Sequence, residues 1–104
     1  MSGRTFIIRR QKRSVQQEKS VATKLAGRRV AGSGSLPGMK GDVNSERWLV
    51  ECKFTDSKGF RVTLPLWWKI EKEAIQKGKL PVMILEIAGR SLAVIDFNDF
   101  LALQ

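Results

Sequence analysis

The stretch GDVNSERWLVECKF, residues 41–54, predicts a β-hairpin made of a short strand, a tight turn at 44–46 and a longer strand. Side chains alternate between the two faces of a strand. The longer strand therefore carries Trp48, Val50, Cys52 and Phe54 on one face, and Leu49, Glu51 and Lys53 on the other. The first face is expected to pack into the core, which leaves Glu51 and Lys53 as neighbours on one surface.

Three charged side chains meet if this hairpin folds as expected. Glu51 and Lys53 would lie about 7 Å apart along the strand, and the turn brings Asp42 alongside them. Carboxylates with open positions suit a hard cation such as Mg²⁺, which can activate a water and stabilise charge on a phosphodiester. A nearby lysine can orient that water or neutralise the phosphate oxygens. The pattern indicates phosphodiester hydrolysis, and the alternative is a cross-strand ion pair that contributes under ~1 kcal/mol.

Positive charge is concentrated in the first two-fifths of the 104-residue chain, whose net charge is +9. Residues 1–40 contain ten Lys or Arg and one acid, whereas residues 41–104 contain nine of each sign. The ten are Arg4, Arg9, Arg10, Lys12, Arg13, Lys19, Lys24, Arg28, Arg29 and Lys40. Such an asymmetry is typical of a polyanion-binding protein, and the scarcity of bulky apolar residues favours nucleic acid over a membrane. The alternative is a basic tail that serves only solubility.

The first predicted helix runs from a cap at Ser14 to an end after Leu25, before Gly27, with Gln17 completing a capping box. Its apolar stripe consists of Val15, Val21, Ala22 and Leu25. Glu18 falls in that stripe. A carboxylate that faces the protein body costs free energy unless it is paired or bound to a metal, and the alternative is that it reaches water at the edge of the stripe.

A Gly- and Ser-rich loop is predicted at 32–41, after a short strand at 28–31. Its backbone amides and the hydroxyls of Ser33 and Ser35 could approach a phosphate, with Arg28, Arg29 and Lys40 beside them. The loop lacks the residue order of a nucleotide-binding P-loop. By itself this signal is weak.

The second half of the chain predicts one helix and two strands. Thr63 can cap a helix that ends before Gly78, with Pro65 in its first turn. Its inward side would carry Trp67, Ile70, Ala74 and Ile75, and its outward side Lys69, Lys72, Glu73 and Lys77. Strands are predicted at 81–88, central because nearly all apolar, and at 91–97, followed by a last helical turn. The order gives a single α/β domain with a mixed sheet flanked by helices.

Composition excludes several classes of protein. Without His or Tyr, and with only one Cys, the chain cannot be a histidine-dependent or tyrosine-dependent nuclease or a zinc finger. Cys52 cannot form an internal disulfide, no apolar run is long enough for a membrane span, and the N-terminus lacks the apolar segment of a secretory signal. A cytoplasmic, non-secreted protein associated with nucleoid or viral DNA is expected.

Several motifs occur in the order typical of one nuclease family. They are QQEKSVATKL, VAGSGS, KGDV, WLVECKFT, VTLPLWWKIEKEA and PVMILEI. Together they resemble the PD-(D/E)xK nuclease superfamily, which has a restriction-endonuclease-like core. The specific likeness is to the small Holliday junction resolvases of archaea and some viruses, and it extends from about Val15 to Phe97.

This resemblance implies a role for each residue of the expected site. Asp42, Glu51 and the backbone carbonyl of Cys52 would bind the metal, and Lys53 would be the catalytic lysine. Glu18 would be the accessory acid on the first helix, and it is also a candidate metal ligand. Ser33 or Ser35 would be the loop serine near the scissile phosphate. Two positions depart from the family pattern. Gly41 stands where the family has proline, and the family's glutamine in the first turn of the second helix is either replaced by Leu66 or displaced, with Lys69 as the candidate substitute.

The resulting hypothesis is a Mg²⁺-dependent endonuclease, with Mn²⁺ able to substitute, that cuts branched DNA such as a four-way junction in recombination and repair. Residues 1–13 would form a basic arm and residues 14–104 the nuclease domain. The basic residues named above, apart from Lys19 and Lys24, would bind DNA together with Ser33, Ser35 and Lys69. A homodimer is expected, with Phe6–Ile8 and the Trp67/Trp68 pair as candidate contacts. The alternatives are a non-catalytic architectural DNA-binding protein on the same fold, and a nickase or restriction-like nuclease.

Overall fold

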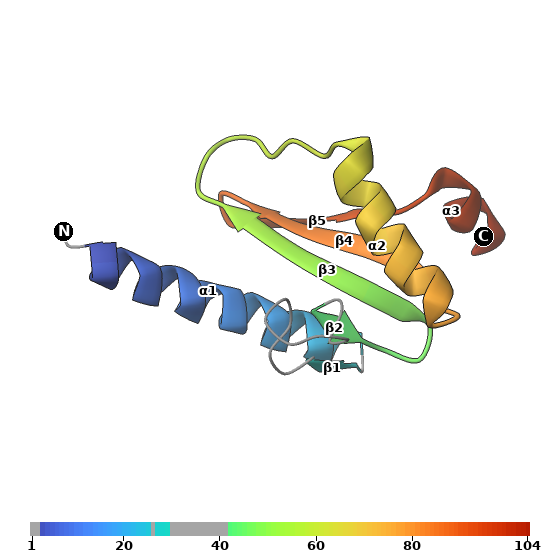
Figure 1. Ribbon diagram of the computed structural model, residues 1–104, viewed down its shortest axis with the longest axis horizontal. Coiled ribbons are helices and arrows are strands. Elements are labelled where there is room, and N and C mark those ends of the chain that lie inside the picture. Colours follow the sequence, from blue (N-terminus) through green and yellow to red (C-terminus); the bar gives the residue numbers. More distant parts are fainter. Residues whose placement is uncertain (1–2, 26, 30–41) are drawn as a thin grey trace.

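A computed structural model describes residues 3–25, 27–29 and 42–104 of the chain. Five strands form one mixed sheet in the order β1-β2-β3-β4-β5. The strands are β1 (Arg28–Arg29), β2 (Val43–Asn44), β3 (Trp48–Thr55), β4 (Leu80–Ile87) and β5 (Arg90–Val94). The helices are α1 (Gly3–Lys24), α2 (Leu64–Gln76) and α3 (Phe97–Ala102) (Figure 1). The predicted α/β fold, a mixed sheet flanked by helices, is confirmed.

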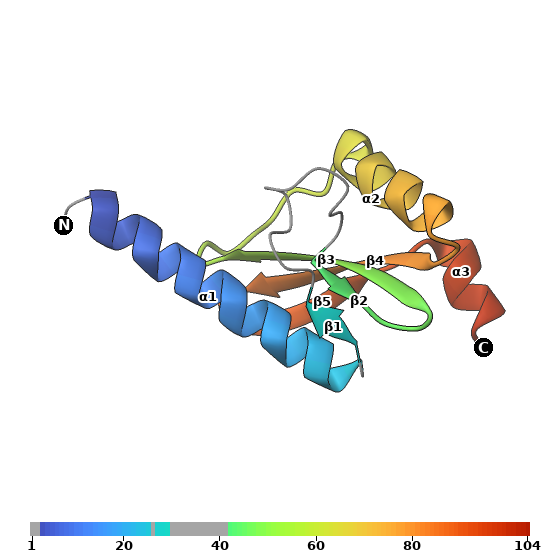
Figure 2. The same ribbon diagram turned by 60° about the horizontal axis from the view of Figure 1, so that its bottom comes forward.

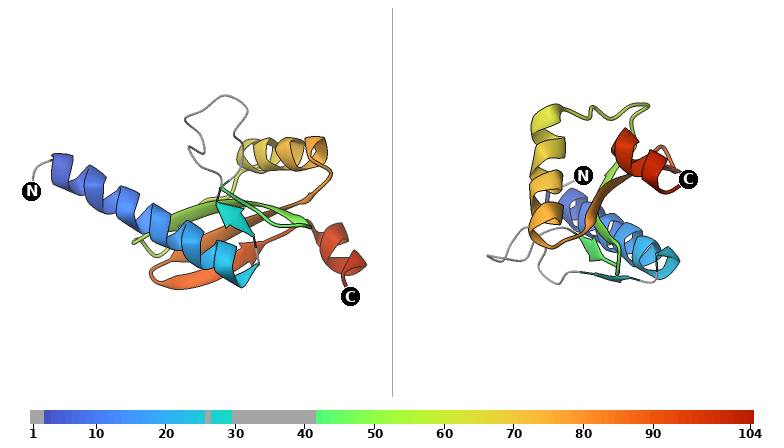
Figure 3. Two further views of the ribbon diagram at one scale, coloured as in Figure 1. Left: turned by 90° about the horizontal axis from the view of Figure 1, so that it is seen from below. Right: turned by 90° about the vertical axis from the view of Figure 1, so that its right-hand side faces the viewer.

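The two long helices lie on opposite faces of the sheet (Figures 2 and 3). On one face α1 packs against a cluster that we call the α1 core, formed by Val21, Ala22, Val43, Val50 and Val82. On the other face α2 packs against the α2 core, formed by Ile70, Met83 and Leu85. Both faces of β3 and β4 are therefore covered, and the face that carries Glu51 and Lys53 is not the open surface that an isolated hairpin would have.

The central pair of strands is parallel. β3 pairs with β4 along its whole length, from Trp48 opposite Leu80 to Thr55 opposite Ile87, and every other pairing in the sheet is antiparallel. A parallel pair needs a crossover connection, and α2 supplies it. The mainly buried apolar side chains of β4 confirm the prediction that this strand is central.

The first helix begins twelve residues earlier than the capping pattern predicted, since a cap at Ser14 would make Val15 its first residue. It starts at Gly3, so Ser14 lies inside it and is not its cap. The Ser14 hydroxyl instead donates a hydrogen bond to Glu18 Oε2 at 3.1 Å, one turn further on. The N-terminal turns of α1, which contain Arg4, Arg9 and Arg10, project past the sheet (Figure 1). The basic segment is thus continuous with the helix, and a domain boundary at residue 13 stays a prediction.

The second helix is capped as predicted but rotated relative to the prediction. The Thr63 hydroxyl accepts a hydrogen bond from the Leu66 amide. Glu73, predicted to face solvent, is buried, and Ile75, predicted to pack on the sheet, is 71% exposed. Ile70, Glu73 and Ala74 are the buried positions, and their i, i+3, i+4 spacing excludes residue 75 from the same face.

The C-terminal strand is shorter than predicted. β5 ends at Val94, and the Asp96 carboxylate accepts hydrogen bonds from the amides of Asn98 and Asp99. This N-cap starts α3 at Phe97, so the last residues of the predicted strand belong to the next turn and helix. The predicted final helical turn is confirmed. Within the described ranges, none of the helices has the length and apolar character needed to cross a bilayer.

Gly27 allows the chain leaving α1 to pass close to the β2–β3 hairpin. A Cβ atom at this position would lie 2.7 Å from the backbone oxygen of Asn44. Replacing Gly27 with Ala is expected to destabilise the fold by about 1–3 kcal/mol, because the obstacle is backbone that cannot rotate away. Thermal unfolding of the variant measures this effect.

The matched control is Gly59→Ala, since nothing lies within 4 Å of a Cβ atom there. This control should change stability by under ~1 kcal/mol in either direction. Equal melting temperatures for the two variants would contradict the close approach at Gly27.

Candidate functional site

The turn of the hairpin sets the register of β2 against β3. Ser45 closes it: its amide donates to the Trp48 carbonyl at 3.0 Å, and its hydroxyl accepts from the Trp48 amide at 3.0 Å. Val43 then lies opposite Val50. On the chain Asp42 directly precedes Val43 and Glu51 directly follows Val50, so the two carboxylates belong to the same end of this paired segment.

The Asp42 carboxylate is held against β3 by the backbone. Its Oδ2 atom accepts a hydrogen bond from the Cys52 amide at 2.7 Å, and the Asp42 amide donates to the Val50 carbonyl at 2.9 Å. Two contacts from one residue to the neighbouring strand leave the carboxylate little freedom. This arrangement fixes an acidic group beside Glu51, which follows Val50 on β3.

Glu51 and Lys53 form an ion pair on the α2 side of the sheet. The Lys53 Nζ atom lies 3.3 Å from Glu51 Oε1, and the Glu51 side chain is 15% exposed. Burial raises the pKa of Glu51, and the negative charge of Asp42 raises it further, while Lys53 and Lys69 act in the opposite direction. A carboxylate whose charge is disfavoured by burial and by a neighbouring acid is a group that a bound divalent cation would stabilise.

Glu18 is buried, with 7% of its surface exposed. This confirms that it faces the protein body, and Ser14 is one of its partners. Burial raises the pKa of the Cys52 thiol, and the negative charges of Asp42, Glu18 and Glu51 raise it further in that order. All three acids are therefore near enough to Cys52 of β3 to act on its thiol, although Glu18 lies on α1, Glu51 on β3 and Asp42 directly before β2.

The acids do not form a three-ligand cluster. In the part of the chain that the structure describes, no three His, Cys, Asp or Glu side chains are placed to share one metal ion. Asp42, Glu51 and the backbone carbonyl of Cys52 offer oxygen atoms of the kind that a hard cation prefers, and their role as its ligands stays a prediction. Glu18 is placed beside this set, not within it.

The predicted DNA-binding residues fall into three groups. Arg4, Arg9, Arg10 and Lys12 lie on α1, Arg28 and Arg29 form β1, and Lys69 lies on α2. Ser33, Ser35 and Lys40 lie outside the described residues. Lys12 and Lys69 are exposed, and Lys69 is near enough to Glu51 to influence its pKa.

Arg13 is engaged within the protein. Its guanidinium pairs with Asp56, lies 4.0 Å from Glu86 and covers the Phe54 ring at 4.6 Å from the ring centroid. These contacts join α1 to the ends of β3 and β4. A role for Arg13 in DNA binding stays a prediction. A DNA phosphate would have to compete with Asp56 and Glu86 for the guanidinium group.

Gln17 supports the site in a way that the sequence did not reveal. The capping-box pattern predicted a local contact, but the amide Nε2 atom donates to the carbonyls of Lys53 at 2.7 Å and Ile84 at 3.3 Å. Gln17 thus ties α1 to the backbone of Lys53. Its position one turn before Val21, on the stripe that faces the sheet, is the signal that could have identified it.

The comparison with solved structures shows what this fold is similar to. The chain resembles a Holliday junction resolvase from the archaeal hyperthermophile Archaeoglobus fulgidus, with a TM-score of 0.57. The match covers 77% of this chain and 85% of that chain, at 15% sequence identity. The sequence matches no family model and no curated protein. At 15% identity the likeness shows the fold alone. It confirms the resemblance drawn from the motifs as far as the fold is concerned.

Proposed function

We propose that this protein is a metal-dependent, structure-specific DNA endonuclease that acts as a Holliday junction resolvase. One observation supports the proposal: Asp42 is near enough to Glu51 to raise its pKa, and Lys53 Nζ lies 3.3 Å from Glu51 Oε1, in a chain whose fold resembles that of a resolvase. A structural hairpin has no need for a glutamate whose charge is disfavoured by a neighbouring carboxylate.

Each residue of the site has a distinct proposed role. Asp42, Glu51 and the Cys52 carbonyl hold Mg²⁺, with Mn²⁺ able to substitute. The bound ion supplies an acidified water and Lewis-acid stabilisation of the phosphate. Lys53 neutralises charge on the phosphate oxygens. The ion pair with Glu51 holds the Lys53 ammonium group beside the proposed ligands. Glu18 acts as a positioning residue next to this set.

DNA is held by basic groups around this site. Lys69 is exposed on α2 and electrostatically close to Glu51, so it can contact a phosphate near the scissile bond. Arg4, Arg9, Arg10 and Lys12 on α1, and Arg28 and Arg29 on β1, extend the basic surface along the substrate. Ser33, Ser35 and Lys40 of the Gly/Ser loop are proposed to contact the phosphate backbone. Phosphate contacts of this kind position DNA without reading its sequence.

A homodimer would allow two strands of a junction to be cut symmetrically. Exposed apolar side chains that could form its interface are Leu64, Trp68 and Ile75 on α2, and Phe97, Phe100 and Leu101 on α3. Of the predicted Trp67/Trp68 pair, Trp68 is 55% exposed whereas Trp67 packs against the α2 core. Trp68 is therefore the better candidate.

Replacing Trp68 with Asp is expected to shift the protein from dimer to monomer, since a charge in an apolar interface costs about 2 kcal/mol or more, a factor of roughly 30 in the dissociation constant. Analytical ultracentrifugation across a concentration series measures this. Lys72→Asp, also exposed on α2, changes charge without removing apolar surface. A Trp68→Asp variant that dimerises as tightly as the Lys72→Asp variant would contradict the assignment.

A second candidate function is a non-catalytic architectural protein on the same fold. The observation that favours it is the Glu51–Lys53 ion pair, which satisfies both groups without a metal, together with the lack of a three-acid cluster among the described residues. A nickase or restriction-like nuclease would use the same site as a resolvase.

The test is cleavage of a labelled four-way junction beside linear duplex of the same sequence, with Mg²⁺ or with EDTA. We expect paired, symmetric incisions in the junction only when the metal is present. Binding of both substrates without cleavage under Mg²⁺ or Mn²⁺ would overturn the nuclease in favour of the architectural protein. Cleavage of linear duplex alone would keep the nuclease and reject the junction.

A further inference from the structure

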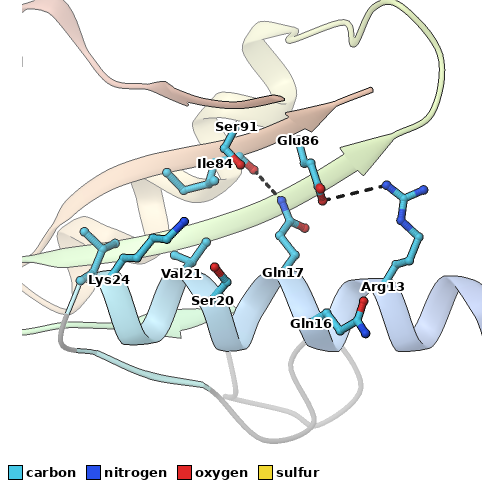
Figure 4. A pocket seen from close by; sticks show the side chains of 10 residues that line it. Arg13, Gln16, Gln17, Ser20, Val21, Lys24, Ile84, Glu86 and Ser91 are labelled. Carbon is cyan, nitrogen blue, oxygen red and sulfur yellow. Dashed lines mark hydrogen bonds and ion pairs between the residues drawn. The ribbon is translucent and has the colours of Figure 1, made fainter. Parts of the chain in front are cut away.

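A cavity of about 340 Å³ opens between α1 and the strands β4 and β5 (Figure 4). It lies on the α1 face of the sheet, whereas Glu51 and Lys53 lie on the α2 face. Its apolar lining comes from Val21, Leu25 and Ile84, and polar groups stand at both ends. This volume is within the range of small-molecule sites, about 300–1,000 Å³.

Gln17 places a buried hydrogen-bond acceptor in the cavity wall. The residue is 7% exposed, and its side chain spans the space between α1 and the sheet (Figure 4). Because Nε2 donates to two carbonyls, the orientation of the amide is defined and the other atom must be the oxygen. That Oε1 atom is the one buried side-chain polar atom without a hydrogen-bond partner among the described residues. A ligand for this cavity would present an N–H or O–H donor to it.

A cation stands at the other end of the cavity. Lys24 lines it, and the Lys24 ammonium group makes no ion pair or hydrogen bond within the described part of the chain. Arg13, by contrast, is already paired with Asp56 and Glu86. Seven residues of helix separate Gln17 from Lys24, which corresponds to about 10 Å along the axis. A ligand that uses both groups would carry an anionic group for the lysine and an N–H or O–H donor for the glutamine.

We propose that this cavity binds one nucleotide unit with an unpaired base. The base donates an N–H to Gln17 Oε1 and lies on the apolar side chains of Ile84 and Val21, and the phosphate contacts Lys24. Every natural base carries an N–H donor at its pairing edge, and that edge is accessible in all four bases only when the base is unpaired, so the acceptor suits an unpaired base. The nucleotide is either free in solution or an unpaired residue of a DNA strand, and both present the same groups.

The test is titration of ¹⁵N-labelled protein with dCMP in EDTA, followed by the backbone amide shifts of Ser20, Val21 and Ile84. Deoxyribose 5-phosphate, inorganic phosphate and an alanine dipeptide are titrated in parallel. We expect dCMP to bind at least about tenfold more tightly than each of these, a difference worth about 1.4 kcal/mol. Equal shifts with phosphate, tighter binding of the dipeptide, or no response to dCMP would each overturn the proposal.

Two variants and one control locate the binding. Gln17→Met should weaken dCMP binding by roughly 5- to 100-fold, the range expected for a lost buried hydrogen bond. Because this change also removes the contacts to Lys53 and Ile84, Ser20→Trp provides a second variant that fills the cavity from its exposed rim. Gln76→Met, an exposed glutamine at the end of α2, should bind as the wild type does. Unchanged affinity in Ser20→Trp would overturn the proposal.

A single-stranded tetranucleotide distinguishes the two sources of the nucleotide. Tighter binding than dCMP at the same three amides would assign the cavity to DNA, and equal or weaker binding would assign it to a free nucleotide. Both outcomes support a nucleotide site. The measurement uses no metal and reads no cleavage, so its result is independent of whether the protein is a nuclease.

Discussion

Glu51→Gln is expected to lower the rate of junction cleavage by about 10²–10³-fold or more, with junction binding retained. Glutamine keeps the shape of the side chain but removes a charged oxygen ligand. The partner carboxylate Asp42 stays fixed by the Cys52 amide, so the local backbone should not change. Single-turnover cleavage measures the rate, and a binding assay in EDTA measures affinity for the junction.

Glu46→Gln is the matched control because Glu46 is exposed in the turn of the same hairpin. The control removes one negative charge from the neighbourhood without touching the proposed ligands. If Glu46→Gln and Glu51→Gln cut at the same rate, Glu51 is not a ligand. If Glu51→Gln cuts slowly but also fails to bind the junction, the lower cleavage rate results from weaker DNA binding and not from loss of the metal ligand.

The same substitution should raise the stability of the metal-free protein at neutral pH. The pKa of Glu51 is raised by burial and then by Asp42, so the folded state favours its protonated form. The stability that Glu51 contributes to the wild type is therefore fully present at pH values below its pKa in the unfolded chain, near 4.5. This contribution is lost as the pH rises through the higher pKa of Glu51 in the folded protein. Glutamine cannot ionise and avoids this loss.

Thermal unfolding in EDTA across a pH series measures the difference. The melting temperature of Glu51→Gln should exceed that of the wild type at neutral pH, and the gap should close as the pH falls toward 4.5. Added Mg²⁺ should then raise the melting temperature of the wild type and not that of the variant, because an ion that binds only the folded state stabilises it. A gap that widens in acid would contradict the sign of the pKa shift.

Met83→Ala is expected to destabilise the protein by about 2–5 kcal/mol. Met83 is fully buried in the α2 core and lies opposite Glu51 in the β3–β4 register. Removing its side chain leaves a cavity under α2 that rigid strands cannot close. Each kcal/mol corresponds to about 4–8 °C in melting temperature for a domain of this size.

The control is Leu92→Ala on the edge strand β5, where the side chain is nearly half exposed. It should cost under ~1 kcal/mol because surface truncations leave no cavity. Chemical denaturation of both variants gives the two free energies of unfolding. Equal decreases in the free energy of unfolding for the two variants would mean that α2 does not form a packed core with β4.

The hairpin shows which features could be predicted from sequence. Alternation along 48–54 assigned Glu51 and Lys53 to one face and Val50 and Cys52 to the other, and the structure places Val50 in the α1 core. A period of two residues is a property of any strand, so it does not depend on the rest of the fold. The same holds for the Thr63 cap, whose contact with the Leu66 amide is local.

Predictions failed where the local sequence was compatible with two different structures. Ser14 is as good a cap as any serine, but the preceding residues also form helix, so the helix continues back to Gly3. Asp96 could have ended a strand at Phe97, yet its carboxylate caps α3 instead. The rotation of α2, which buries Glu73 and exposes Ile75, was decided by packing on β4, because its apolar residues occupy both sides of the helix.

The sequence by itself determined the candidate site and the fold class: it places two carboxylates and a lysine on a hairpin, confines the excess positive charge to residues 1–40, and orders its elements as α/β. Only the tertiary structure decided how those groups are supported. Gln17 bonds the backbone of Lys53, and Arg13 bonds Asp56 and Glu86. These contacts join residues more than thirty positions apart, and local periodicity carries no information about partners at that separation.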